Sequence, residues 1–283
     1  MSASEPSLAR PASLDEAAAA RGNGARPLAG GTDLVQLVRD RLVPTDSLVD
    51  VRGLLPRGIE DGRVGAGTTL SELESSEAVP AALREACRLA ASPQLRNMGT
   101  IGGNLLQATR CWYWRLAFPC YLHGGDRCHA REGEHREHAI FANEPCASAH
   151  PSDPAAALLA LGAEVETTAR RFPLGELYRL PTEADRSLTT LEPGELILAL
   201  HVPEPDASVY LKTMDRRRFS FALVGVAAAR FSNRTRLALA GVAPIPWALD
   251  SPAGLDGATP LPGNEYKLEI ARALVRRTLD QLS

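Results

Sequence analysis

The chain has 283 residues, of which 45% are hydrophobic and 23% charged, and its formal net charge is -3. This composition is that of a globular protein with room for two or three domain cores, which excludes fibrous and disordered chains. The charge provides no basic surface of the kind that nucleic-acid phosphates require. No stretch approaches the roughly 20 apolar residues of a membrane span, and the first residues lack a signal-peptide pattern. We therefore expect a cytosolic chain that binds no nucleic acid and spans no membrane.

The first part of the chain, to about residue 53, predicts alternating helices and strands. Helices are expected around residues 13–21 and 32–42, and strands at 25–29 and 47–51. In the sequence RPLAGGTDL, Gly30 and Gly31 allow backbone conformations that are closed to other residues. Thr32 or Asp33 is then a candidate N-cap for the following helix.

The middle of the chain predicts a strand at 63–66, an amphipathic helix at 80–91 and a strand that ends near Thr168. Its sequence GTIGGNLLQ contains a second double-glycine turn, with Gly102 and Gly103. A strand, glycines and a helix start present free N–H groups to an anion. One such turn is more often purely structural, but two of them suit a pyrophosphate that is held from both sides. Neither turn matches the Rossmann fingerprint or the phosphate loop.

The last part, from about residue 169, contains four alternating apolar segments and a closing helix at 268–282. The segments are ELILALHVPE, SVYLKTM, FALVGVAAARFS and TRLALAGVAP. Because strands and helices do not alternate strictly along the chain, the pattern predicts an α+β architecture rather than a doubly wound sheet.

A cluster of cysteines and histidines interrupts the middle part. In a reducing compartment such clusters bind metal more often than they form disulfides. The spacings differ from the C-x2-C pairs of common zinc modules, and four thiolates can also hold an iron–sulfur cluster. A zinc site and an iron–sulfur cluster are therefore both possible interpretations of the cysteines at this point. The nearby histidines are expected at the surface or in hydrogen bonds rather than as ligands, and Cys87 is expected as a buried hydrophobe. The clustered residues are Cys111, Cys120, Cys128, Cys146, His123, His129, His135, His138 and His150.

Three motifs together resemble the FAD-binding medium subunit of the molybdenum hydroxylases, the family of xanthine dehydrogenase, aldehyde oxidoreductase and carbon monoxide dehydrogenase flavoproteins. They are PLAGGTDL at 27–34, ASPQLRNMGTIGGNL at 91–105 and HPSD at 150–153, and the resemblance continues through 210–229 and 264–275. It implies an oxidoreductase subunit with an α+β fold. Residues 1–168 would form a two-subdomain FAD-binding domain of the vanillyl-alcohol-oxidase (PCMH-like) type, divided near residue 53. Residues 169–283 would form a C-terminal α+β domain of the carbon monoxide dehydrogenase flavoprotein type.

The cysteine-rich stretch resembles an insertion found in one branch of that family, which includes the hydroxybenzoyl-CoA reductase flavoprotein and periplasmic aldehyde oxidoreductases. In that branch the insertion carries a 4Fe-4S cluster. The resemblance therefore implies a cluster loop at 109–147 with Cys111, Cys120, Cys128 and Cys146 as thiolate ligands. Residues 112–114, WYW, would either shield this cluster from water or anchor the loop.

The family pattern also implies which residues bind FAD. The pyrophosphate would contact, mainly through backbone N–H groups, Ala29, Gly30, Gly31, Thr32 and Asp33 in one turn and Thr100, Ile101, Gly102, Gly103 and Asn104 in the other. Asp153 resembles the family acid that bonds flavin ribityl or nearby hydroxyls, although a helix N-cap is an equal alternative. Lys267 matches a family lysine near the flavin ring, whereas Lys212, on an expected strand, is expected in solvent. No residue is assigned a catalytic role.

The resemblance further implies two partners. A large molybdopterin subunit would hydroxylate a substrate, and a small subunit with two 2Fe-2S clusters would pass the electrons to FAD; in the reductase relatives electrons run the other way. The complex could be a dimer of heterotrimers, and it could be exported on the signal peptide of a partner subunit. Two other classes also remain: a zinc-stabilised binding protein and a stand-alone flavin oxidase.

Overall fold

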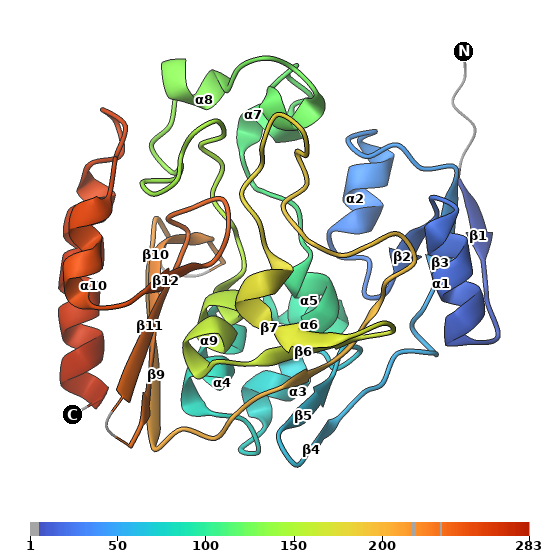
Figure 1. Ribbon diagram of the computed structural model, residues 1–283, viewed down its shortest axis with the longest axis horizontal. Coiled ribbons are helices and arrows are strands. Elements are labelled where there is room, and N and C mark those ends of the chain that lie inside the picture. The colour runs from blue at the N-terminus through green and yellow to red at the C-terminus, as the bar shows by residue number, and fades with distance from the viewer. Residues whose placement is uncertain (1–5, 217–218, 233, 283) are drawn as a thin grey trace.

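The computed structural model describes residues 6–216, 219–232 and 234–282. Three β-sheets succeed one another along the long axis of the molecule, each with its own helices (Figure 1). The N-terminal sheet lies at one end, a five-stranded sheet lies in the middle and a four-stranded sheet with the C-terminal helix lies at the other end. The α+β class expected from the sequence is confirmed.

The N-terminal unit is a small parallel sheet. It consists of β1 (Ser7–Ala9), α1 (Leu14–Gly22), β2 (Arg26–Leu28), α2 (Leu34–Arg39) and β3 (Ser47–Asp50). Strands β1 and β2 both pair with the central β3 in parallel. The four predicted elements are therefore confirmed. Strand β1 was not predicted because it has only three residues, all exposed, and so carries no periodic apolar pattern.

The middle unit joins an antiparallel sheet to a group of helices. Its strands lie in the order β4 (Ile59–Glu60), β5 (Arg63–Gly65), β8 (Ile197–His201), β6 (Glu164–Thr167) and β7 (Arg171–Pro173). Its helices are α3 (Leu70–Ser75), α4 (Ala81–Leu89), α5 (Pro93–Met98), α6 (Ile101–Leu105), α9 (Asp153–Leu161) and the 3-10 turn η2 (Leu174–Leu177). Strand β8 comes from beyond residue 168, so this sheet extends past the expected domain division.

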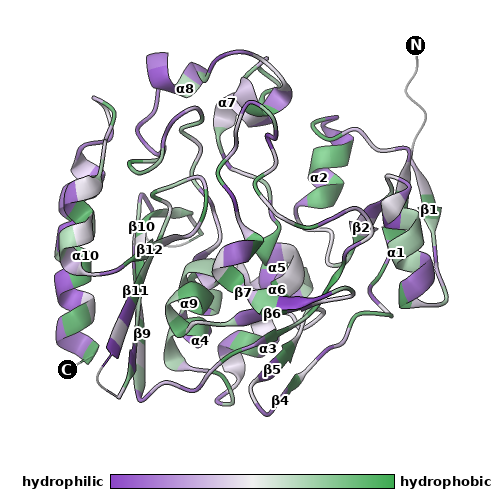
Figure 2. Cartoon of the chain, viewed as in Figure 1, coloured by the Kyte–Doolittle hydropathy of each residue, from purple (hydrophilic) through white to green (hydrophobic). Residues whose placement is uncertain are grey.

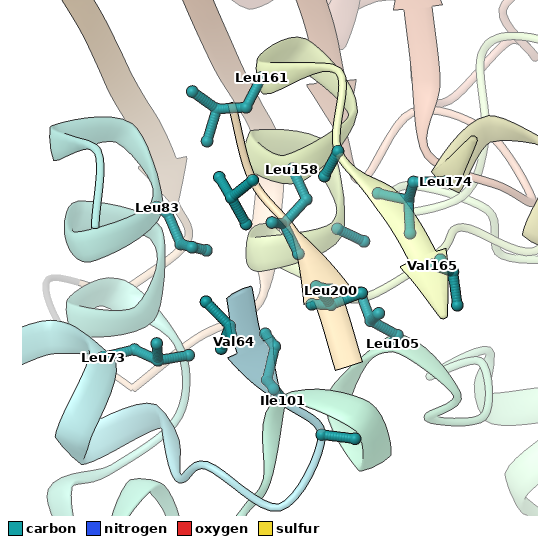
Figure 3. Close-up of a cluster of buried hydrophobic side chains, with 14 of the residues drawn as sticks. Val64, Leu73, Leu83, Ile101, Leu105, Leu158, Leu161, Val165, Leu174 and Leu200 are labelled. Carbon is teal, nitrogen blue, oxygen red and sulfur yellow. The ribbon is translucent and has the colours of Figure 1, made fainter. Parts of the chain in front are cut away.

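A buried apolar cluster joins these helices to the sheet (Figure 3). Leu83 from α4, Ile101 from α6 and Leu158 from α9 converge on Val64 and Leu200 of neighbouring strands. After its first residue, Asp153, helix α9 is apolar (Figure 2), because it packs against α4 on one side and against β10 and β11 of the C-terminal sheet on the other.

The C-terminal unit is an antiparallel sheet covered by one long helix. The strands lie in the order β12 (Trp247–Leu249), β11 (Arg234–Ala240), β10 (Ala222–Phe231) and β9 (Ala207–Met214). The 3-10 turn η3 (Pro252–Gly257) leads to α10 (Tyr266–Leu282), which packs on β9 and β10. Helix α10 alternates polar and apolar residues (Figure 2), as expected for a helix that buries one face.

The cysteine-rich loop, residues 109–147, lies along one edge of the molecule between the N-terminal unit and α10 (Figure 1). It contains only α7 (Trp112–Arg115), η1 (Tyr121–His123) and α8 (His129–Glu132) as regular structure. Among the described residues, none of the helices has the length and apolar character needed to cross a bilayer.

Candidate functional site

A cleft of about 690 Å³ opens where the N-terminal and middle units meet. Its volume is within the ~300–1,000 Å³ range of ligand and cofactor pockets. Most of the residues expected to bind FAD line this cleft, and they do so from segments far apart in the sequence. These residues are Ala29, Gly30, Gly31, Thr32, Asp33, Thr100, Gly102, Gly103, Asn104 and Asp153. Ile101 does not line it, because its side chain is fully buried in the core of the middle unit.

The first glycine turn fits tightly against the middle unit. A Cβ on Gly30 would lie 2.0 Å from the carbonyl oxygen of Met98, so only glycine allows this approach. Gly31 has a φ of +72°, in the left-handed region that favours glycine. The amide N–H groups of residues 30–33 have no hydrogen-bond partner among the described residues. Four free amides on a cleft wall are suited to bind an anion.

The second glycine turn has a different role. Its amides are already used: Gly102 donates to the carbonyl of Ala66, and Gly103 donates to Oγ1 of Thr100, the N-cap of α6. A Cβ on Gly102 would lie only 3.0 Å from that of Ala66. This turn therefore contributes close packing and cleft surface, and it offers fewer free donors than the sequence pattern predicts.

Asp33 connects the cleft to the start of the cysteine-rich loop. It occupies the N-cap position of α2, but its side chain makes no capping bond. Its carboxylate instead accepts from the amide of Ala108 at 2.8 Å and faces Arg110 and Arg115 at 3.0 and 2.9 Å. The guanidinium of Arg110 also lies 4.7 Å from the ring centre of Phe221, and both residues line the cleft. Sequence reasoning missed both arginines, although each stands within five residues of Cys111.

Asp153 is the first residue of α9, and the helix N-cap is Ser152, so the N-cap alternative for Asp153 is wrong. The buried Asp153 carboxylate accepts from the hydroxyl of Tyr210 at 2.5 Å and from Nζ of Lys212 at 2.7 Å. The Lys212 side chain is only 1% exposed, so the expectation of a solvated lysine is also wrong. Lys212 points from β9 toward the helices of the middle unit, where it pairs with the Asp153 carboxylate. The alternation SVYLKTM did not indicate this, because it places Lys212 on the face opposite to Val209 and Leu211.

The structure does not bring Lys267 to the cleft. Its side chain is fully buried in α10, and Nζ donates to the carbonyls of Glu137, His138 and Gly241 at 2.6–3.0 Å. Burial lowers the pKa of Lys267 to about 7. This lysine therefore connects the C-terminal helix to the end of the cysteine-rich loop instead of lining the cleft.

The four loop cysteines lie near one another and are not joined in disulfides. The charges of Cys120 and Cys128 help to raise the pKa of Cys111 to about 11, after burial as the main cause. A hydrogen bond with Cys146 lowers the pKa of Cys128 to about 5. The same hydrogen bond raises the pKa of the Cys146 thiol. Cys87, by contrast, is fully buried in the core of the middle unit, as expected.

The surroundings of the cysteines include features for and against a metal site. Backbone amides hydrogen-bond to each of the four sulfurs, and Nε2 of the buried His138 lies 3.1 Å from Sγ of Cys111. Within the described ranges, however, no three His, Cys, Asp or Glu side chains are arranged to hold a metal ion. Trp114 is buried against Leu37 and Leu42 of the N-terminal unit, which fits the role of a loop anchor.

A smaller cavity of about 330 Å³ adjoins the cleft and shares several of its residues. His150, the residue at which the loop returns to the middle unit, lines this cavity and is buried against the ring of Tyr178. Burial lowers the pKa of His150 to about 4, so its imidazole is neutral near pH 7.

The fold and the cleft define a two-subdomain cofactor-binding protein with an appended C-terminal domain. Residues 3–205 match the family model described as the FAD binding domain in molybdopterin dehydrogenase, and the chain belongs to this family. The expected oxidoreductase class is thereby confirmed.

Individual relatives agree with this assignment. The chain is 39% identical over 247 residues to the aldehyde oxidoreductase FAD-binding subunit PaoB of Escherichia coli (strain K12), covering 81% of this chain and 78% of that protein. It is 42% identical over 107 residues to the carbon monoxide dehydrogenase medium chain of Afipia carboxidovorans, which covers 34% of this chain and 37% of that protein.

The fold agrees with a solved structure over the full length. The reconstituted CO dehydrogenase from Oligotropha carboxidovorans superposes with a TM-score of 0.72 at 24% identity, covering 100% of this chain and 99% of that one. The expected fold, an FAD-binding domain followed by a C-terminal domain, is thus confirmed.

Proposed function

We propose that this chain is the electron-transfer subunit of a molybdenum-dependent hydroxylase complex, with FAD in the cleft and a 4Fe-4S cluster on the cysteine-rich loop. The observation that carries the FAD part is the cleft itself, with free amides on the first glycine turn and the second turn packed against it. The residues that would hold the cofactor are Ala29, Gly30, Gly31, Thr32, Asp33, Thr100, Gly102, Gly103, Asn104 and Asp153. Bound FAD supplies the ability to accept single electrons and deliver a pair.

The cluster part of the proposal rests on the four neighbouring cysteines and the amides that face them. Hydrogen bonds to sulfur are among the features that set the reduction potentials of iron–sulfur centres. The loop brings Cys111 next to a half-buried arginine pair at the cleft, because Arg110 and Arg115 both form ion pairs with Asp33. We propose Cys111, Cys120, Cys128 and Cys146 as its ligands.

The partners in this proposal are a small subunit with 2Fe-2S clusters and a large molybdopterin subunit. Electrons would pass between the small subunit and an external acceptor or donor through this chain. The family model and the aldehyde oxidoreductase relative support a role in such a complex.

We also propose a domain division that follows β8 rather than residue 168, since β8 pairs with β5 and β6 in the middle sheet.

The test is the visible absorption of the anaerobically purified protein before and after dithionite. Flavin bands at about 370 and 450 nm with a broad shoulder at about 400 nm, all bleached by reduction, are expected. Cys111→Ser should lose iron and keep FAD, and the matched variant Cys87→Ala should keep both, because Cys87 lies in the distant core. Flavin without the shoulder, and equal iron in both variants, would show the cluster assignment to be wrong. Substrate turnover by the isolated chain would instead favour a stand-alone oxidase.

A further inference from the structure

Strand β9 presents a row of polar side chains to the middle unit. Ser208, Tyr210 and Lys212 alternate along the strand and therefore point to one face. Each bonds to a helix of the middle unit: Ser208 accepts from the amide of Ala82 in α4, and Tyr210 and Lys212 donate to Asp153 in α9. A sheet face buried against helices is ordinarily apolar, so this row requires an explanation.

Tyr210 and Lys212 are built into their positions. On the neighbouring strand, a Cβ at Gly225 would lie 2.2 Å from the Tyr210 hydroxyl, so the glycine leaves room for that group. Burial and the nearby Asp153 carboxylate raise the pKa of Tyr210, which keeps the hydroxyl protonated and donating. Lys212 also donates to the carbonyl of Leu89 at 3.0 Å. Leu89 ends α4, and the next two residues, Ala90 and Ala91, line the cleft.

Within the described part of the chain, these bonds do not exhaust the acceptor capacity of Asp153. An ionised carboxylate has about four acceptor positions. Tyr210 takes one on Oδ1 and Lys212 takes one on Oδ2, so each oxygen retains a position, and Asp153 lines the cleft. The two donors also offset part of the cost of burying this charge.

We propose that Tyr210 and Lys212 are positioning residues of the cofactor site: they fix Asp153 as a hydrogen-bond acceptor for the bound FAD and hold the end of α4 at the cleft wall. The inference rests on the proposed function. It makes the C-terminal sheet part of the FAD site, although β9 itself does not line the cleft.

The test measures FAD affinity of the full-length chain after removal of its cofactor, by quenching of flavin fluorescence on rebinding. Tyr210→Phe and Lys212→Met should each weaken FAD binding by about 10- to 100-fold, as expected when a charged buried hydrogen bond is lost. Two matched variants should bind FAD within about twofold of the native chain. Ser208→Ala removes the polar contact on the same strand face away from the cleft, and Tyr266→Phe removes a tyrosine hydroxyl that donates to the Arg136 carbonyl.

A double-mutant cycle separates positioning from general destabilisation. In an Asp153→Asn background, Tyr210→Phe should have little further effect on FAD affinity, because the carboxylate it positions is gone. Thermal unfolding of the cofactor-free variants gives the stability effect separately. Unchanged affinity in Tyr210→Phe, or an equal loss with and without the Asp153 carboxylate, would overturn this inference alone. Failure of the native chain to bind FAD would overturn the proposed function together with it.

Discussion

The cleft and the cysteine-rich loop are held in place by different means. The cleft walls are made of backbone: glycines allow close approach, and helices of the middle core position the turns. The loop has little regular structure and is held by long side chains from its surroundings. Arg186 donates to carbonyls of Tyr121 and Gly125, and Lys267 and Asn264 donate to carbonyls at 135–139. Substitutions should therefore act through sterics at the cleft and through lost hydrogen bonds at the loop.

The largest effect is expected from Gly30→Ala. The added Cβ would meet the Met98 carbonyl at 2.0 Å, and this backbone oxygen cannot move away without shifting α5. We expect the free energy of unfolding to fall by about 3 kcal/mol, with FAD affinity reduced at least about tenfold. Urea unfolding and flavin titration measure the two effects. Gly53→Ala is the matched control, because nothing lies within 4 Å of a Cβ there; equal stability of the two variants would contradict a backbone-built cleft.

The second prediction concerns His150, where the loop returns to the cleft. Its folded-state pKa is lowered to about 4, so between pH 6.5 and 4 the unfolded chain binds more protons than the folded chain. His150 therefore contributes stability above pH 6.5 that is lost as the pH falls to 4, about 3 kcal/mol in all. In His150→Asn the loss of stability between pH 7 and pH 4 should be smaller by that amount. If the free energy of unfolding fell equally with pH in the two proteins, the folded-state pKa of His150 would not be lowered, and the prediction would be wrong.

Lys267→Met tests the attachment of the loop. The carbonyls of Glu137 and Gly241 would lose this donor, at a cost of about 2 kcal/mol. Hydrogen exchange should speed up at residues 135–139 and stay unchanged at the glycine turns of the cleft. Tyr266→Phe, which removes one bond to the same loop, should cost less than about 1 kcal/mol. Faster exchange at the cleft in Lys267→Met would mean that the two regions are not held independently.

The smallest effect is expected at Thr100, the N-cap of α6. Thr100→Ala removes the bond from the Gly103 amide to Oγ1 and should cost about 1 kcal/mol. Since Gly103 lines the cleft and its backbone stays in place, FAD affinity should stay within about threefold of the native value. A larger loss of affinity than of stability would show that the threonine hydroxyl itself contacts the cofactor.

The amino-acid sequence alone predicted many of the longer helices and strands and the two glycine turns that line the cleft, but not β1. Its helices and strands follow from apolar periodicity, and the two double-glycine motifs mark positions where the backbone needs freedom, a property of single residues that the sequence displays directly. The cysteine cluster was visible for the same reason, because its members are close in the chain.

Which charged groups meet depends on the packing of segments that are distant in the chain. Asp153 and Lys212 are 59 residues apart, and no local pattern indicates that a strand lysine turns inward to a carboxylate. Lys267 was placed at the flavin by resemblance, yet its three carbonyl partners lie on two other segments, the cysteine-rich loop and the turn after β11. The difference between the two glycine turns likewise depends on Ala66 and Met98 from other elements. Burial and pairing are properties of the packed chain, and a buried charge finds its partner only when the units are brought together.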